Sequence, residues 1–154
     1  MCINMNKLTK VLLTVCLTTP LLASAGDLVK KASAHSVKET MDKFETLIKS
    51  KGMSVFARVD HQKNALTVDM KMNEAEVLIF GNPKGGTVLM KQDIAVSLDL
   101  PLRVAVYKDS EGKVWLSYHN PQGLKADYNV AGGAKVMDKV EGALDKLTTA
   151  VTKP

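Results

Sequence analysis

Apolar residues recur at helical spacing in two segments, one near each end of the chain. The positions are Val37, Met41, Phe44 and Ile48 in the first segment, and Val136, Val140, Leu144, Leu147 and Val151 in the second. Spacings of three and four residues place each set on one face of an α-helix. Ser36 and Glu39 form a capping-box pattern before the first segment, and Gly52 follows it. The sequence therefore predicts two amphipathic helices, the second spanning residues 134–151.

Shorter apolar or alternating segments before and between these helices predict strands. They cover residues 28–33, 53–59, 75–81, 100–108 and 113–118. The segment LTVDMKM, residues 66–72, also alternates, which predicts one buried strand face made of Leu66, Val68, Met70 and Met72. The turn chemistry of residues 109–112 joins the last two strands as a hairpin, and Asn120-Pro121 predicts a short helix after them. A series of strands with helices at both ends predicts an α+β fold with an antiparallel sheet.

Residues 1–25 have the composition of a signal peptide. Lys7 and Lys10 precede an apolar run, and Ala23-Ser24-Ala25 supplies small residues before a cleavage site at Gly26. We therefore expect an exported protein, periplasmic or secreted, with no stable membrane anchor after cleavage. Cys2 and Cys16 would leave with the signal, so we expect no disulfide and no thiol chemistry in the mature chain.

Charge excludes one class of partner. The formal net charge is +5, part of which comes from the two lysines of the signal segment, and basic residues occur only in short pairs such as Lys30-Lys31. Nucleic-acid binding needs a clustered basic face, so we expect no nucleic-acid partner.

A glycine-rich stretch, LIFGNPKGGTVLM at residues 78–90, has the form of a strand followed by a turn and a helix. Gly81 and Gly86 have the spacing of a P-loop, but Thr87 and Val88 stand where Lys and Ser or Thr are required. The stretch therefore predicts a corner in which Pro83 stiffens the turn and Thr87 caps the next helix. Backbone amides at such a helix start can hold a small anion or carboxylate.

Three longer stretches, SVKETMDKFETLIKSKGMSVFARVDH, VLIFGNPKGGTVLM and DLPLRVAVYKDSEGKVWLSYHNP, together resemble the bacterial domain-of-unknown-function family 302. The resemblance covers residues 33–130. It implies a fold similar to the TATA-binding-protein arrangement, with helices on one face of a curved antiparallel sheet, and it implies a homodimer. The family has a short helix within residues 62–73, where the alternation here predicts a strand. The predicted organisation is a signal peptide at 1–25, this domain at 26–131, and an amphipathic helical extension at 132–154.

Residues at three strand ends are the candidate site, because neighbouring strand ends of an antiparallel sheet can share a groove. The expected ligand-binding residues are Asp60, His61, Phe80, Gly81, Asn82, Pro83 and Tyr118, with His119 beside them. The corner would supply amides, Asn82 a side-chain amide, and His61 a titratable nitrogen. The expected ligand is small and anionic or carbonyl-bearing.

Two alternatives remain open besides a non-catalytic ligand- or partner-binding protein. An enzyme would use Asp60 and His61, and a metal or haem carrier would use His61 with Met70 and Met72. The sequence shows no nucleophile constellation, and His35, His61 and His119 lack the spacing of a local metal site. The non-catalytic reading, without a metal or other cofactor, is therefore favoured.

Overall fold

The computed structural model describes residues 28–154, so the predicted signal peptide lies outside the described residues. The strands are β1 (Leu28–Ala32), β2 (Ser54–Asp60), β3 (Ala75–Gly81), β4 (Leu102–Lys108) and β5 (Val114–His119). The helices are α1 (Val37–Ser50), α2 (His61–Leu66), α3 (Pro83–Met90), η1 (Ile94–Leu98), η2 (Pro121–Gly123), α4 (Leu124–Asp127), η3 (Ala131–Gly133) and α5 (Ala134–Thr152). Within residues 28–154, every helix is too short or too polar to cross a membrane.

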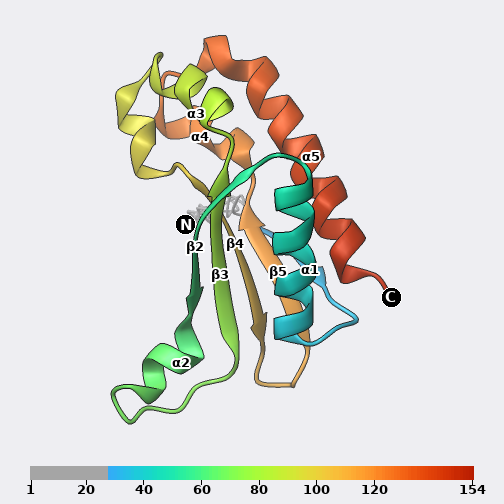
Figure 1. Ribbon diagram of the computed structural model, residues 1–154. Helices are drawn as coiled ribbons and strands as arrows, with labels where there is room; N and C mark the ends of the chain where they lie inside the picture. The colour runs from blue at the N-terminus through green and yellow to red at the C-terminus, as the bar shows by residue number, and fades with distance from the viewer. Residues whose placement is uncertain (1–27) are drawn as a thin grey trace, which may run out of the picture.

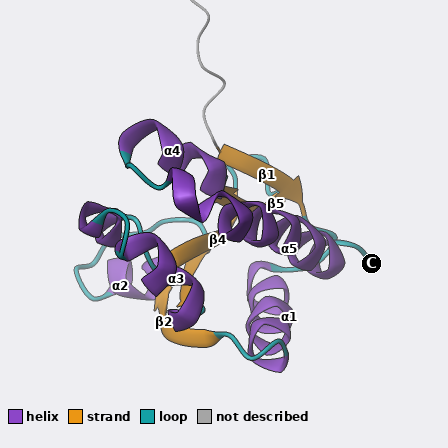
Figure 2. Cartoon of the chain, turned by 90° about the horizontal axis from the view of Figure 1, so that it is seen from above, coloured by secondary structure: helices purple, strands orange, loops and turns teal. Residues whose placement is uncertain are grey.

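The sheet has five strands in the order β1-β5-β4-β3-β2, and every neighbouring pair is antiparallel. Helices α1 and α5 pack on the same face of this sheet, while α3, η1 and α4 gather at one of its ends (Figures 1 and 2). The predicted α+β class with helices on one face is therefore confirmed.

The core lies between the sheet and the two long helices. Both predicted apolar helix faces contribute to it, with Met41, Phe44 and Ile48 from α1 and Leu144, Leu147 and Val151 from α5. Alternate strand residues meet them, namely Leu78, Phe80, Val104, Val106, Leu116 and Tyr118. The rings of Phe44 and Phe80 pack edge to face with centroids 5.3 Å apart.

The start of α1 forms half of the predicted capping box. The Ser36 hydroxyl accepts a hydrogen bond from the Glu39 amide at 3.2 Å. The Glu39 carboxylate does not complete the box but turns to Lys43, at 3.1 Å, and to His35, at 3.3 Å. Gly52, just past the helix, has a φ of 72°, a backbone conformation that glycine adopts without strain.

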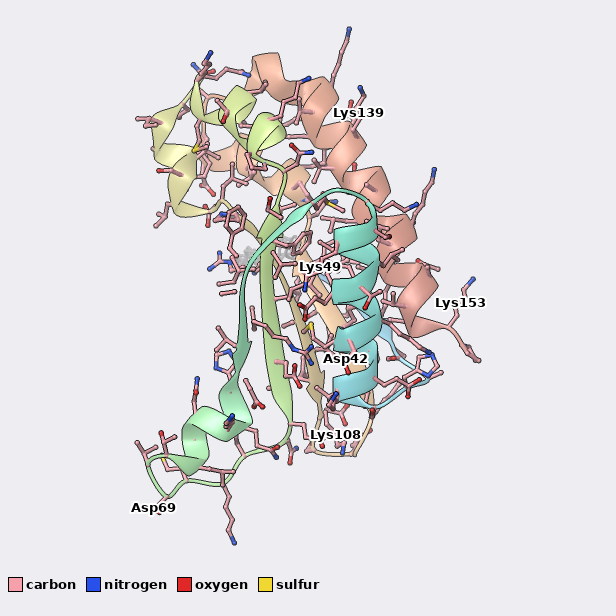
Figure 3. All side chains as sticks on the ribbon, in the orientation of Figure 1. Asp42, Lys49, Asp69, Lys108, Lys139 and Lys153 are labelled. Carbon is pink, nitrogen blue, oxygen red and sulfur yellow. The ribbon has the colours of Figure 1, made fainter. Side chains whose placement is uncertain are left out.

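Residues 61–74, which we call the arm, differ from the prediction. The Asp60 carboxylate accepts a hydrogen bond from the Lys63 amide at 2.8 Å, so the chain turns into α2 instead of continuing as a strand. Beyond α2 the arm projects past the sheet, with Asp69 near its tip (Figures 1 and 3). The four residues expected to be buried are instead exposed, at 60% for Leu66, 63% for Val68, 63% for Met70 and 43% for Met72.

Arg58 of β2 connects the sheet to α1. Its Nη1 donates to Asp42 at 2.6 Å and to Glu45 at 3.1 Å, and its Nε donates to Glu76 of β3 at 2.6 Å. The guanidinium fork thereby satisfies three carboxylates from two elements. This cluster holds the α1 helix over the edge of the sheet.

The first and last described elements are joined directly. The Lys31 ammonium of β1 lies 2.7 Å from the Asp145 carboxylate of α5. The Ala34 amide donates to the Thr152 carbonyl at 2.9 Å, at the last residue of α5. The helix α5 is therefore part of the packed domain and not a loose extension.

Candidate functional site

The corner between β3 and α3 is built by Asn82. Its side-chain oxygen accepts hydrogen bonds from the amides of Lys84, at 3.0 Å, and Gly85, at 3.4 Å, which makes it the N-cap of α3. Pro83 occupies the first helical position, where a missing N–H has no consequence. The helix therefore begins four residues before Thr87, and the predicted capping role of Thr87 is wrong.

The amides at this helix start are already bonded. Besides the two held by the Asn82 side chain, the Gly86 amide donates to the Asn82 carbonyl at 2.9 Å. An anion at the corner would have to compete with Asn82 for these donors. The expected amide cradle for an anion thus gains no support from the geometry.

A cavity of about 240 Å³ opens beside the corner, and we call it the corner cavity. Its lining residues are uncharged: Phe56, Gly81, Asn82, Pro83, Gly85, Gly86, Met90, Leu100, Pro101, Leu102 and Val140. The glycines leave the space open, because a Cβ on Gly86 would point to within 3.8 Å of Met90 and 3.9 Å of Leu100. The cavity thus collects apolar side chains from β2, α3, β4 and α5.

A second cavity, of about 230 Å³, lies at the same end of the sheet and is more polar. Its lining residues are Asp99, Leu102, Arg103, His119, Asn120, Pro121, Gly123, Leu124, Asp127 and Leu144. The Tyr128 hydroxyl donates to Asp99 at 2.6 Å, and Arg103 lies 3.6 Å from the same carboxylate. The hydrogen bond to Asp99 raises the pKa of Tyr128 to about 12, so this tyrosine stays a donor at neutral pH.

Comparison with known proteins assigns this chain to a family. The family model described as "Domain of unknown function DUF302" matches residues 29–150. The chain belongs to the DUF302 family. The matched range includes α5 up to residue 150, so the boundary expected at residues 131–132 falls inside it.

A solved structure shows the same DUF302 fold. The crystal structure of an uncharacterized conserved DUF302 protein from Bacillus stearothermophilus superposes with a TM-score of 0.68 at 17% sequence identity. The superposition covers 81% of this chain and 94% of that one. At this identity the likeness shows the fold alone.

Curated relatives of this DUF302 chain are longer proteins. Proteins named "Fluoride-specific ion channel FluC 1" from Brucella suis biovar 1 (strain 1330) and Brucella abortus biovar 1 (strain 9-941) are each 40% identical over 136 residues. The match covers 87% of this chain, and 52% and 49% of the two relatives. The chain thus spans about half the length of the curated relatives it matches.

The structure separates the predicted site residues of the DUF302 domain. Ser54 pairs with Gly81 and Asp60 pairs with Glu76, so β2 runs away from the corner. At 3.3 Å per residue, Asp60 and His61 lie about 20 Å from the corner, at the opposite end of the sheet. The predicted convergence is therefore wrong for these two residues, because the antiparallel strands β2 and β3 finish at opposite ends of the sheet.

The other predicted residues divide between cavity and core. Gly81, Asn82 and Pro83 line the corner cavity, and His119 lines the polar cavity. Phe80 is fully buried beneath α1, and Tyr118 is 5% exposed beneath α5, where burial raises its pKa. Phe80 and Tyr118 thus serve the core of the DUF302 domain and line neither cavity.

The residues of the metal-carrier alternative lie in the arm. His61, Met70 and Met72 are all exposed there, at the end of the sheet remote from both cavities. Across residues 28–154, no three His, Cys, Asp or Glu side chains are grouped as metal ligands. His35 has a structural contact instead: its Nε2 lies 2.7 Å from the carbonyl oxygen of Lys153.

Sequence reasoning missed several cavity residues of this DUF302 chain. Phe56, Met90 and Val140 come from three different elements, and Arg103 lies on the strand that neighbours the corner. Each sits in an ordinary amphipathic pattern, and only the tertiary packing brings them together.

Proposed function

We propose that this DUF302 chain is an exported, non-catalytic binding domain that holds a small, largely apolar molecule in the corner cavity. The uncharged lining of that cavity carries the proposal. Ligand sites are typically concave and apolar with few polar groups, and here Asn82 is the one polar side chain of the lining. The small residues at 23–25 support export. The lining offers neither a nucleophile nor a general base, which favours binding over catalysis.

Filling the cavity tests the proposal. The Gly86→Leu variant would place a side chain among Met90 and Leu100, and we expect it to weaken binding of the probe 1-octanol at least tenfold in an NMR titration. The matched control is Gly142→Leu in α5, where a Cβ has open space and the cavity is untouched. Equal octanol affinity in a folded Gly86→Leu variant would show that the cavity is not the binding site.

We also propose that the protein is a homodimer. The exposed apolar residues of the arm, together with half-buried Ile79, Tyr107 and Trp115 on the sheet face opposite α1 and α5, supply an apolar surface of the kind that marks association sites. A self-complementary surface of this kind suits a two-fold dimer.

Light scattering tests the dimer. We expect the parent protein to be dimeric at high micromolar concentration and Met70→Asp to shift it towards the monomer, because a charge would replace an exposed apolar contact. Ser97→Asp, in the exposed helix η1 at the other end of the sheet, adds the same charge away from the arm and should leave the dimer intact. A monomeric parent protein would contradict the proposal.

A second candidate function comes from the curated relatives, which are named as fluoride channels. We infer that the shared stretch is a domain accompanying the channel part, because its sheet ends in the open edge strands β1 and β2, which cannot lie in a bilayer interior. Its ligand would then be fluoride, held by N–H donors of Arg103 and His119 in the polar cavity. Fluoride-induced NMR shifts at these residues would support this function, and shifts from octanol alone would support the first.

A further inference from the structure

The residues next in sequence to those that line the corner cavity carry a net positive charge. The flanking cations are Lys84, Lys91, Arg103 and Lys139, and the flanking acids are Asp99 and Glu141. Both acids are engaged: Asp99 accepts from Tyr128 at 2.6 Å, and Glu141 accepts from Asn120 at 2.7 Å and from Gln122 at 2.9 Å. The surroundings of the apolar cavity therefore favour a negative charge.

The ion pairs formed within residues 28–154 leave three of these cations without an acidic partner. The lysines in ion pairs are Lys31, Lys38, Lys43, Lys49 and Lys108. Lys84, Lys91 and Lys139 are exposed and outside these pairs. Figure 3 shows Lys139 projecting from α5 at the end of the molecule that carries α3.

Lys84 is the best placed of the three. It lies between Pro83 and Gly85, which both line the cavity, in the first turn of α3. Its flexible four-carbon stem lets the ammonium group move over the cavity mouth without disturbing the Asn82 cap.

Resting on the proposed function, we infer that the ligand is a small amphiphilic carboxylate, with its alkyl chain in the corner cavity and its carboxylate at Lys84. An apolar chain matches the uncharged lining, and a single charged head matches Lys84, which stands between two lining residues in the chain. Nucleotides fit poorly, because their polar body would face apolar side chains.

A paired comparison of two probes tests the inference separately from the proposed function. Octanoate and 1-octanol have the same chain length and differ in the head group. At neutral pH and low salt, we expect the parent protein to bind octanoate about three- to fivefold more tightly, the range of an exposed ion pair. Shortening the carboxylate from octanoate to hexanoate should weaken binding by about fourfold per methylene.

The Lys84→Gln variant should remove the advantage of octanoate and leave octanol affinity unchanged. Lys63→Gln, in α2 at the other end of the sheet, makes the same charge change and should alter neither affinity. The inference is overturned if the parent protein binds octanoate no more tightly than octanol, if Lys84→Gln keeps the difference, or if octanoate binds undiminished to Gly86→Leu. Failure of both probes to bind the parent protein overturns the proposed function as well.

Discussion

Replacing Phe80 by alanine is expected to lower the free energy of unfolding by about 3–5 kcal/mol. Phe80 is fully buried, and its ring packs against Phe44, so truncation removes contacts between β3 and α1 and leaves a cavity in the core. Urea denaturation followed by circular dichroism measures the change. The slope of the transition should stay constant if only stability is altered.

Phe56→Ala provides the matched control, because the same side chain is removed from the neighbouring strand. Phe56 is 54% exposed, so we expect its loss to change stability by about 0.5 kcal/mol or less. This variant should weaken octanol binding instead, since Phe56 lines the corner cavity. Comparable destabilisation by both substitutions would contradict the assignment of Phe80 to the core and Phe56 to the cavity.

The second large effect is expected at Arg58. Arg58→Leu removes the cation shared by Asp42, Glu45 and Glu76, and we expect a loss of about 2–3 kcal/mol, below the range for a fully buried pair because the Arg58 side chain is 26% exposed. The uncompensated carboxylates, not the lost packing, cause most of this loss. Arg103→Leu removes a guanidinium that is 56% exposed and should cost about 0.5 kcal/mol or less.

The loss of stability caused by Arg58→Leu should depend on pH, and the direction of this dependence follows from the pKa shifts. Hydrogen bonds from Lys38 and then Arg58 lower the pKa of Asp42, and hydrogen bonds from Lys49 and then Arg58 lower the pKa of Glu45. The ordinary pKa values of these carboxyl groups are 3.8 and 4.5, so the stabilisation is complete above these values and is lost as pH falls through the lowered pKa values of the folded state. The difference between parent and variant should therefore be full at neutral pH and shrink in acid. A difference that stays constant down to about pH 2 would show that the carboxylates are not involved.

Local sequence patterns predicted most of the fold, because the apolar residues that form these patterns are the ones that pack in the core. The helical spacing of Val37, Met41, Phe44 and Ile48 became the buried face of α1, and the hairpin formed where the turn residues placed it. The alternation of residues 66–72 misled, because these residues follow the short helix α2 and pair with no strand of the described sheet. The alternation of apolar and polar residues cannot by itself show whether a segment has a neighbouring strand to pair with.

The sequence predicted the site only where glycine and proline mark a turn. Gly81 and Pro83 identified the corner, and both line the cavity that the structure places there. The sequence pattern grouped His61 with the corner because each follows the end of a strand. Antiparallel pairing of β2 and β3 puts these two strand ends at opposite ends of the sheet. The chemistry of the corner also differs from the prediction, since Asn82 satisfies the amides and apolar side chains fill the surroundings.

The direct contacts between the ends of the domain have a consequence for biosynthesis. Strand β1 is made first, yet it pairs only with β5, and its Lys31 reaches only to α5. The Ala34 amide finds its acceptor at Thr152, the last residue of α5. A growing chain therefore lacks the strand partner of β1 until β5 is made, and it lacks the contacts of Lys31 and Ala34 until α5 is made. Pairing across so long a stretch of sequence closes slowly. The first strand of the domain therefore stays exposed while most of the remaining domain is made.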